Sequence, residues 1–345
     1  MALDTSILFP ILKKQGYHIV GSHSAVKRCK WYKESMLGRG ACYKSKFYGI
    51  NSHQCMQSTP CLQYCTQGCV FCWRVQGRDR EEKYSKIGRE IGFAASRHNE
   101  LPKKNMAWDS PEHILDGIVK EQLGFAEGYN GHPGATKEKV MEARNPRLLT
   151  LSLAGEPTLY SYLPELIRLA GNKGFLTFLV TNGTSPSMLK KLIAKKSLPT
   201  QLYISMDAPD KESYLKTCNP CSPSLWAKYL ESLKVMKKLK GNTRAVLRMT
   251  LVRRHNDGNL EGYADQIKEA EPDYVEVKSF VFVGGSRSEN RGLKLEDMLK
   301  MDEIRGIGKK LAKLTGYTLT DEHEPSRVVL LVRDQTAETK RILKY

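Results

Sequence analysis

The sequence has no apolar stretch long enough to cross a bilayer, and it has no basic start of the kind that opens a signal peptide. The apolar run near its N-terminus, Ile7 to Leu12, is short and is interrupted by Pro10. Internal repeats and low-complexity tracts are also absent. We therefore expect a cytoplasmic protein without membrane contact, whose nine cysteines are thiols or metal ligands, not disulfides.

Acidic residues are scarce relative to basic ones. The chain has 55 Lys and Arg against 37 Asp and Glu, which gives a formal net charge of +18. A surplus of this size favours a polyanionic partner, nucleic acid first and a membrane surface second. The competing explanation is a generally lysine-rich composition. The length of 345 residues suits one large domain or one domain with extensions.

Three cysteines lie close together in the stretch Cys65-x3-Cys69-x2-Cys72. Three thiolates at this spacing can ligate three irons of one [4Fe-4S] cube and leave the fourth iron open to a small molecule. Gly68 gives the loop conformational freedom, and Phe71 can shield a cluster. A structural zinc site usually needs two cysteine pairs, so it fits less well. The spacing resembles the radical S-adenosylmethionine (SAM) superfamily, in which the open iron binds SAM.

Three more cysteines, Cys29, Cys42 and Cys55, recur at intervals of thirteen residues upstream. They either hold a second [4Fe-4S] cube or are three separate buried thiols, and the spacing alone favours neither. Lys44 lies two residues after Cys42, where a desolvated amine can form a Schiff base with a carbonyl substrate. Lys46, two residues further on, lies at an equivalent alternating position, so the sequence alone does not choose between the two lysines. A solvated surface position is the more common situation for such a lysine.

From residue 109 onward, helical and strand patterns alternate. Strands are predicted at residues 148–153, 175–180, 201–206, 244–252, 274–283 and 327–333, and helices at 110–124, 163–171, 187–196, 225–240, 260–270 and 298–314. Together with a first strand before the cysteine loop, this pattern predicts an α/β fold: a partly open, TIM-like (β/α)6 barrel. Residues 74–105 are charge-dense and are predicted to form a surface insertion, partly helical.

Ligands of such sheets bind at the carboxyl ends of the strands. Gly155-Glu156 follows one strand and resembles the glycine–glutamate motif that binds the SAM amino group in radical SAM enzymes, although Ala154 replaces the first glycine. Asn182, Ser205 and Arg248 lie where they can supply donors to the SAM carboxylate and ribose. The alternatives are an ordinary strand-end turn for Gly155-Glu156 and a structural ion pair for Arg248.

Several longer motifs resemble the archaeal 4-demethylwyosine synthase family of tRNA wybutosine-type modification. They are Cys42-Tyr43-Lys44 with Lys46–Ile50, Phe71–Arg74, Ser152–Pro157, Val180–Thr184, Leu198–Tyr203 and Glu324–Leu330. The resemblance covers about residues 15 to 335. Archaeal members lack the flavodoxin domain of their eukaryotic relatives, and no such domain is evident in this chain.

The resemblance implies a reaction and a set of partners. N1-methylguanosine, 3′ of the anticodon of tRNA(Phe), would condense with pyruvate through a 5′-deoxyadenosyl radical to give 4-demethylwyosine. SAM and two [4Fe-4S] clusters would serve as cofactors, the second cluster on Cys29, Cys42 and Cys55. Lys44 would form a Schiff base with pyruvate, or the second cluster would chelate pyruvate instead. We further expect contact with the anticodon stem-loop, a reductase or ferredoxin-type electron donor and a monomer.

The expected division of the chain has three parts. Residues 1–60 carry the second cluster site, residues 61–285 form the radical SAM core, and residues 286–345 form a C-terminal extension that contacts tRNA. Cys61, Cys218 and Cys221 have no assigned role. Two other functions remain open: a radical SAM enzyme acting on a small molecule or peptide, and a non-catalytic iron–sulfur protein that binds RNA.

Overall fold

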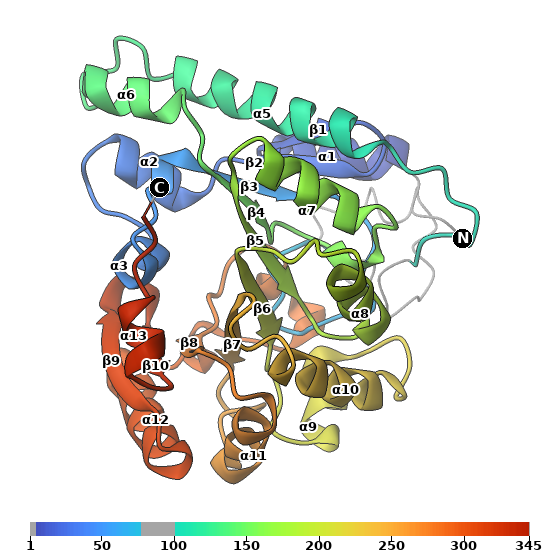
Figure 1. Cartoon of the computed structure of the whole chain (residues 1–345), viewed down its shortest axis with the longest axis vertical. Coiled ribbons are helices and arrows are strands. Elements are labelled where there is room, and N and C mark those ends of the chain that lie inside the picture. Colours follow the sequence, from blue (N-terminus) through green and yellow to red (C-terminus); the bar gives the residue numbers. More distant parts are fainter. Residues whose placement is uncertain (1–4, 77–100, 345) are drawn as a thin grey trace.

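The computed structural model describes residues 5–76 and 101–344, and its strands form one curved sheet (Figure 1). The strand order is β1-β2-β3-β4-β5-β6-β7-β8-β10-β9. The strands are β1 (Tyr17–Val20), β2 (Ser24–Lys27), β3 (Cys55–Thr59), β4 (Leu148–Leu151), β5 (Leu176–Thr181), β6 (Gln201–Ser205), β7 (Arg244–Leu251), β8 (Tyr274–Ser279), β9 (Thr318–His323) and β10 (Val328–Val332). Strands β3 to β8 are parallel, which confirms the six-unit open barrel.

Helices cover the outside of this sheet. In Figure 1, α5, α7, α8, α10, α11 and α12 follow one another around it, and each packs on the next. The helices are α1 (Thr5–Lys14), α2 (Lys30–Met36), α3 (Tyr43–Tyr48), α5 (Pro111–Glu127), α6 (Lys137–Ala143), α7 (Leu163–Asn172), α8 (Pro186–Ala194), α9 (Lys211–Cys218), α10 (Leu225–Lys237), α11 (Leu260–Ala270), α12 (Met301–Thr315) and α13 (Gln335–Thr339).

Helix starts follow local hydrogen-bonding chemistry. Ser110 caps α5 as predicted, because its hydroxyl accepts a hydrogen bond from the backbone N–H of His113 at 3.2 Å. Helix α12 begins three residues later than predicted. The reason is that residues 295–297 form a short 3-10 turn, and the Glu303 carboxylate accepts the backbone N–H of Lys300 to start the helix there.

The two faces of the sheet are buried against different partners. On the outer face, alternate strand residues such as Leu149, Leu202 and Leu247 pack under the helices. On the inner face, Phe178 and Tyr203 join a second cluster that α3 fills from within, through residues that include Tyr43, Phe47 and Tyr48. Helix α3 therefore lies inside the curve of the sheet, and it brings the N-terminal segment into the barrel interior.

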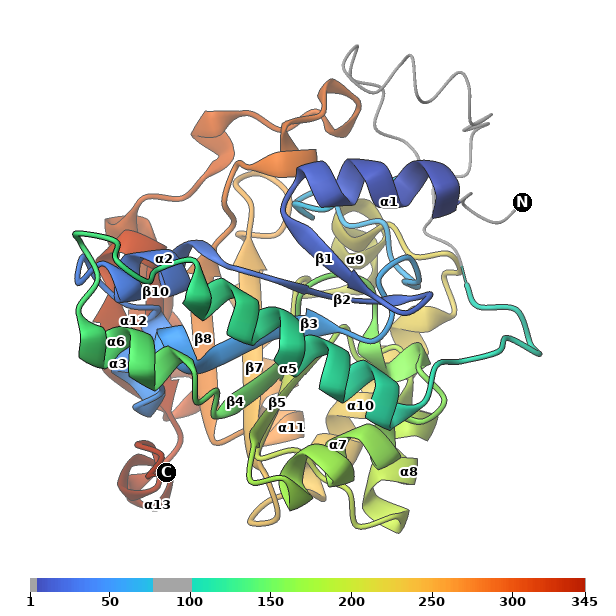
Figure 2. The same cartoon turned by 90° about the horizontal axis from the view of Figure 1, so that it is seen from above.

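Antiparallel strands extend the barrel at both edges, and the sequence did not predict most of them. β1 and β2 form a hairpin next to β3, and β9 adds to β10, which itself runs antiparallel to β8. Viewed from above, α1 lies beside the β1–β2 hairpin at one rim (Figure 2). Strand β8 ends at Ser279, four residues before its predicted end, because Phe280 bonds back to Leu251 and the chain then turns through residues 284–287.

Two predictions stay untested by this architecture. Residues 77–100, the larger part of the expected surface insertion, lie outside the described residues. The three-part division of the chain also remains a prediction; β10 and β9, from its third part, belong to the same sheet as the rest. Among the residues that the structure describes, no helix is long and apolar enough to span a membrane.

Candidate active site

The cysteine loop after β3 is held by hydrogen bonds to a second loop at the end of α9. The backbone N–H of Gly68 donates to Cys218 at 3.1 Å, that of Val70 donates to Thr217 at 2.9 Å, and that of Cys221 donates back to Thr66 at 2.9 Å. These bonds fix the path of the loop through backbone atoms alone. The loop is therefore anchored to the α9 end by its own backbone.

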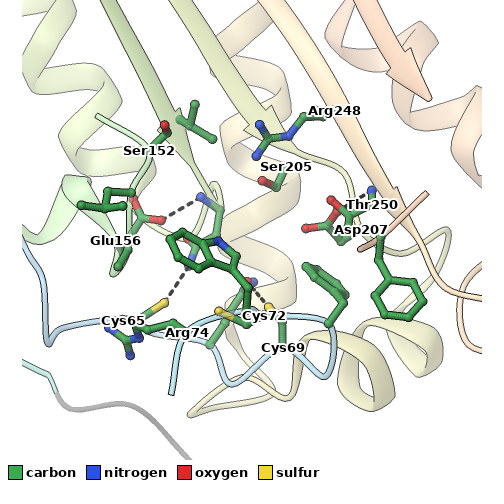
Figure 3. A pocket seen from close by; sticks show the side chains of 18 of the residues that line it. Cys65, Cys69, Cys72, Arg74, Ser152, Glu156, Ser205, Asp207, Arg248 and Thr250 are labelled. Carbon is green, nitrogen blue, oxygen red and sulfur yellow. Dashed lines mark hydrogen bonds between the residues drawn. The ribbon is translucent and has the colours of Figure 1, made fainter. Parts of the chain in front are cut away.

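The thiols of Cys65, Cys69 and Cys72 line one cavity of about 330 Å³, which opens at the carboxyl ends of the parallel strands. Figure 3 shows the three sulfurs along the loop, with Glu156, Ser205, Asp207 and Arg248 on the strand ends opposite. Burial raises the pKa of Cys65 to about 12, and contact with the Cys218 side chain, followed by burial, raises the pKa of Cys69 well above its usual value. A bound cation would favour the thiolate forms of Cys65 and Cys69.

The donor set fits an iron–sulfur cube better than a single ion. Within residues 5–76 and 101–344, no three His, Cys, Asp or Glu side chains are grouped closely enough to hold one metal ion. The thiols of a cube each bind a different iron, so they do not need to converge on one point. Three cysteines around one cavity, with no carboxylate between them on the loop, match that requirement.

Gly155 allows the strand-end loop after β4 to lie directly against the start of the cysteine loop. Its φ of +69° is in the left-handed region, and a Cβ at this position would collide with the carbonyl oxygen of Cys61. The next residue, Glu156, donates its backbone N–H to the carbonyl of Tyr64 at 2.7 Å. Gly155 is thus needed for the close approach of the two backbones.

The Glu156 carboxylate is buried and already well bonded. One oxygen accepts the backbone N–H and hydroxyl of Thr158 (3.0 and 2.6 Å) and the hydroxyl of Thr181 (2.6 Å), while the other accepts the backbone N–H of Asn182 (2.8 Å). Burial raises its pKa, and these hydrogen bonds oppose that shift. The second oxygen accepts only this one hydrogen bond, so it has a lone pair for a further donor, and Glu156 lines the cavity.

The remaining predicted residues lie around the same cavity. Asn182 donates its amide to the hydroxyl of Thr66 at 2.9 Å and lies 3.9 Å from the sulfur of Cys65, so it connects strand β5 to the cysteine loop. Ser205 and Arg248 are partners in register on β6 and β7, and both line the cavity. The structure therefore brings all five predicted SAM-binding residues and the three cysteines together.

Three charged residues of this cavity were not predicted as site residues: Arg74, Asp207 and Lys278. Asp207 accepts the backbone N–H of Thr250 at 2.9 Å, and burial raises its pKa to about 7. The sequence contains a signal for Lys278. Strands buried on both faces are normally apolar throughout, so Glu276 and Lys278 at alternate positions of β8 mark a polar interior.

The second set of cysteines comes from three different elements. Cys29 precedes α2 and accepts the backbone N–H of Tyr32 at 3.3 Å, Cys42 precedes α3, and Cys55 opens β3 with its sulfur 3.2 Å from the hydroxyl of Thr150. Burial raises the pKa of all three, to about 12 for Cys42 and about 11 for Cys55. Their charges also act on one another, so the fold gathers them into one group.

Lys44 lies inside the barrel beside this group. Its side chain is buried, with the ammonium 4.5 Å from the ring centre of Tyr203 and 5.4 Å from that of Phe178. Burial, and next the positive charge of Arg248, lower its pKa. Lys46 points elsewhere, to Asp321 on β9 at 3.0 Å. Of the two lysines, the structure places Lys44 at the interior.

Two tyrosines of α3, the helix that follows Cys42, bond to one carboxylate on β8. Tyr43, which also lines the cavity, donates its hydroxyl to Glu276 at 2.9 Å, and Tyr48 donates to the other Glu276 oxygen at 2.7 Å. Tyr48 is fully buried, which excludes it as a stacking partner for a nucleobase. Tyr43 therefore connects the cavity of the cysteine loop to Glu276 and to the interior that holds Lys44.

A third segment supports the cysteine loop from the side of β8. The Arg291 guanidinium donates to the backbone carbonyls of Cys72 and Arg74, and Gly285 donates its N–H to the carbonyl of Trp73 at 2.8 Å. A Cβ at Gly285 would collide with this backbone. Two distant segments, residues 217–221 and 284–291, thus hold the loop on both sides.

Comparison with known proteins gives two family matches. The family model of the radical SAM superfamily matches residues 127–267, and the model for wyosine base formation matches residues 269–333. The two matches adjoin and together cover the barrel after β3. Neither includes the cysteine loop, so the structural grouping of the cysteines is an independent observation.

The chain is similar over most of its length to curated tRNA-modifying enzymes. It is 43% identical over 325 residues, 94% of this chain and 88% of the relative, to the S-adenosyl-L-methionine-dependent tRNA 4-demethylwyosine synthase of Pyrococcus horikoshii. The chain belongs to this family. The synthase of Methanocaldococcus jannaschii is 40% identical over 94% of this chain and 95% of its own length. The Saccharomyces cerevisiae synthase is 33% identical, but the match spans only 38% of that longer protein.

Solved structures of 4-demethylwyosine synthases support the fold. A structure of TYW1 with a lysine–pyruvate adduct bound matches with a TM-score of 0.78 at 36% identity, over 97% of both chains. A crystal structure of archaeal TYW1 matches with a TM-score of 0.73 at 33% identity, over 97% of this chain and 98% of the other. The predicted fold, the radical SAM class and the tRNA-modifying activity of this synthase are thereby confirmed.

Proposed function

We propose that this 4-demethylwyosine synthase condenses N1-methylguanosine, 3′ of the anticodon of tRNA(Phe), with pyruvate. The observation that carries the proposal is the position of Lys44: a buried amine between the second cysteine set and the polar interior. A lysine–pyruvate adduct is present in the solved TYW1 structure that this chain matches at 36% identity. In this chain, Lys44 would form such an adduct.

Two iron–sulfur clusters are part of the proposal. Cys65, Cys69 and Cys72 would hold one, and Cys29, Cys42 and Cys55 the other. The first cluster, held by the cysteine loop and reduced, would supply a 5′-deoxyadenosyl radical from SAM. The family name supports SAM as a cofactor, and the grouping of two separate thiol sets supports the number of two clusters.

The residues of the chain would bind and orient the reactants. The free lone pair of Glu156 and the backbone at Gly155 would receive the SAM ammonium, while Asn182 and Ser205 would donate to its polar groups. Arg248 would bind its carboxylate. Lys44 would hold pyruvate as an imine, with Phe178 and Tyr203 excluding water from it.

The tRNA would bind at the cavity mouth. Val281 and Val283 line the cavity and are exposed there, and the Arg287 guanidinium lies 5.9 Å from the ring centre of Phe282 between them. An unstacked anticodon-loop base can be received by such apolar and cationic groups. The net charge of +18 would draw in the phosphate backbone with salt-dependent affinity. We further propose a cytoplasmic monomer reduced by a reductase or ferredoxin.

The test is an anaerobic iron and sulfide count after reconstitution, followed by an assay with tRNA and pyruvate. The wild type should hold about eight irons per chain, and a Cys29→Ala/Cys42→Ala/Cys55→Ala variant about four. The variant should still cleave SAM but form no product. About four irons in both proteins would remove the second cluster, and product formation without pyruvate would remove the proposed substrate.

A further inference from the structure

The reaction cavity has to hold two carboxylates at once if the proposed function is correct. One belongs to the methionine part of SAM and the other to pyruvate. Two cationic side chains from neighbouring strands line the cavity opposite the cysteine loop: Arg248 on β7 and Lys278 on β8. A third, Arg74, belongs to the cysteine loop itself, and its guanidinium donates to the carbonyl of Leu62 at 2.6 Å.

Lys278 has spare hydrogen-bonding capacity. Its ammonium donates one hydrogen bond, to the backbone carbonyl of Ser279 at 2.8 Å, and an ammonium group carries three donors. In the part of the chain that the structure describes, no carboxylate forms an ion pair with it. The nearest acidic residue on the same face of β8, Glu276, is occupied by the hydroxyls of Tyr43 and Tyr48.

The surroundings of Lys278 favour an anion. Burial and the positive charge of Arg248 lower its pKa to about 8, while the Glu276 carboxylate opposes this shift. At neutral pH the side chain is therefore mainly a cation, although it is poorly solvated. A carboxylate that enters the cavity would replace the lost hydration and form a charge-assisted hydrogen bond.

The position of Lys278 separates it from the SAM-binding residues. Arg248 is paired in register with Ser205, on the side of the sheet that leads through β6 and β5 to Glu156 and Cys65. Lys278 lies one strand further on, and its charge interacts with that of Cys42. The Lys44 ammonium and the Arg248 guanidinium lie against the same ring, at 4.5 and 5.8 Å from the ring centre of Tyr203. Glu276, two residues before Lys278, accepts the hydroxyl of Tyr43, the residue before Lys44, at 2.9 Å. Lys278 and Lys44 thus share one charged neighbourhood.

We propose that the Lys278 ammonium binds the carboxylate of the 2-oxo acid while the Lys44 amine takes up its carbonyl carbon. Lys278 is then the residue that makes the site specific for a carbonyl next to a carboxylate. In the imine-forming step, the Lys44 nitrogen bonds to the carbonyl carbon, the oxygen leaves as water, and the ion pair at Lys278 is retained. This inference rests on the proposed function.

Reductive trapping tests the proposal without tRNA turnover. The anaerobically reconstituted full chain is incubated with isotope-labelled pyruvate and cyanoborohydride, and the label on the Lys44 peptide is measured by mass spectrometry. Replacing Lys278 by Met keeps the length of the side chain but removes its charge. We expect the half-saturating pyruvate concentration to rise about tenfold to a hundredfold in this variant.

A second readout separates charge from structure. Pyruvamide has nearly the shape of pyruvate but no negative charge, so wild type should trap pyruvate far better than pyruvamide, and Lys278→Met should lose most of that preference. Lys278→Arg should restore most of it. Lys46→Met, at the exposed lysine that pairs with Asp321, is the matched control and should behave as wild type.

Three results would overturn the inference. An unchanged preference for pyruvate over pyruvamide in Lys278→Met shows that the carboxylate is bound elsewhere. A raised KM for SAM in uncoupled SAM cleavage, with normal pyruvate trapping, assigns Lys278 to SAM instead. Wild type that traps no label on Lys44 contradicts the proposed function itself. Iron content equal to that of wild type shows that a variant is folded.

Discussion

The two cysteine sets of this 4-demethylwyosine synthase are built in opposite ways. Cys65, Cys69 and Cys72 lie within eight consecutive residues on one loop, and distant segments are needed only to hold that loop. Cys29, Cys42 and Cys55 lie on three separate elements, so packing of α2, α3 and β3 alone brings them together. The comparison teaches that one site is local in sequence and the other is a product of the fold.

The largest expected effect separates Cys69, a proposed cluster ligand, from Cys218, the cysteine that it contacts. Cys218 contacts Cys69 and is the more deeply buried of the two, but it lies outside the three-cysteine spacing. Cys69→Ser should reduce SAM cleavage to background, because one iron loses its ligand. Cys218→Ser should retain cleavage within about twofold of wild type, since a change of one buried thiol is small on the scale of activity. Both are measured as 5′-deoxyadenosine release under anaerobic conditions.

Iron content provides the control for this pair. Cys218→Ser should hold as much iron as wild type, whereas Cys69→Ser should lose the equivalent of one cube. Equal losses in the two variants would mean that Cys218 also serves the cluster, and that the three-cysteine assignment is incomplete.

A smaller effect should show whether the hydrogen bond between α3 and Glu276 stabilises the fold around the second cysteine set. Tyr48→Phe removes the hydroxyl that donates to Glu276 at 2.7 Å and leaves a buried carboxylate oxygen without that partner. We expect the free energy of unfolding to fall by about 1–3 kcal/mol. Urea denaturation of the reconstituted protein measures this, with iron content recorded alongside.

The matched control for Tyr48→Phe is Tyr162→Phe, at a tyrosine that is 46% exposed. It should change stability by less than about 0.5 kcal/mol. If the two variants are equally stable, the bond between Tyr48 and Glu276 does not support the position of α3.

The smallest effect is the pH dependence of stability that comes from Asp207, in the cavity of the cysteine loop. The pKa of Asp207 is raised by burial from 3.8 to about 7. Between these values the unfolded chain releases a proton that the folded chain keeps, so this group makes stability fall as pH rises. Asp207→Asn removes the effect and keeps an oxygen that can accept the N–H of Thr250.

The measurement is the difference in free energy of unfolding between Asp207→Asn and wild type at pH 5 and at pH 7. One pKa unit corresponds to about 1.4 kcal/mol. Because Asp207 lines a cavity that solvent can enter, we expect the advantage of the variant to grow by only about 1 kcal/mol across this range. A constant difference would show that Asp207 titrates normally in the fold.

The sequence allowed prediction of the barrel because its βα units carry strong local patterns. Helix α11 spans the predicted residues 260–270, and strands β4 to β8 all begin within one residue of the predicted positions. The β1–β2 hairpin could not be predicted, because strands of four residues show no clear period. Strand β9 was also missed, because Thr318–His323 is polar, as edge strands often are.

The site could be predicted to a similar extent and for similar reasons. Gly155, Glu156 and Asn182 follow strands, and topology alone places strand ends along one edge of a sheet. By contrast, the proximity of Cys29 to Cys42 and Cys55, and the occupation of Glu276 by two tyrosines, depend on α3 packing inside the barrel. Contacts between elements distant in sequence carry no local signal.

The clamping of the cysteine loop has a consequence for protein engineering. A short peptide that copies residues 65–72 lacks both the α9 loop that bonds to Gly68 and Val70 and the segment in which Arg291 binds the carbonyl of Cys72. Transplanting the motif into another scaffold therefore requires three chain segments, not one. For the same reason, a fragment that stops at residue 285 would lose Arg291 and its bonds to the carbonyls of Cys72 and Arg74.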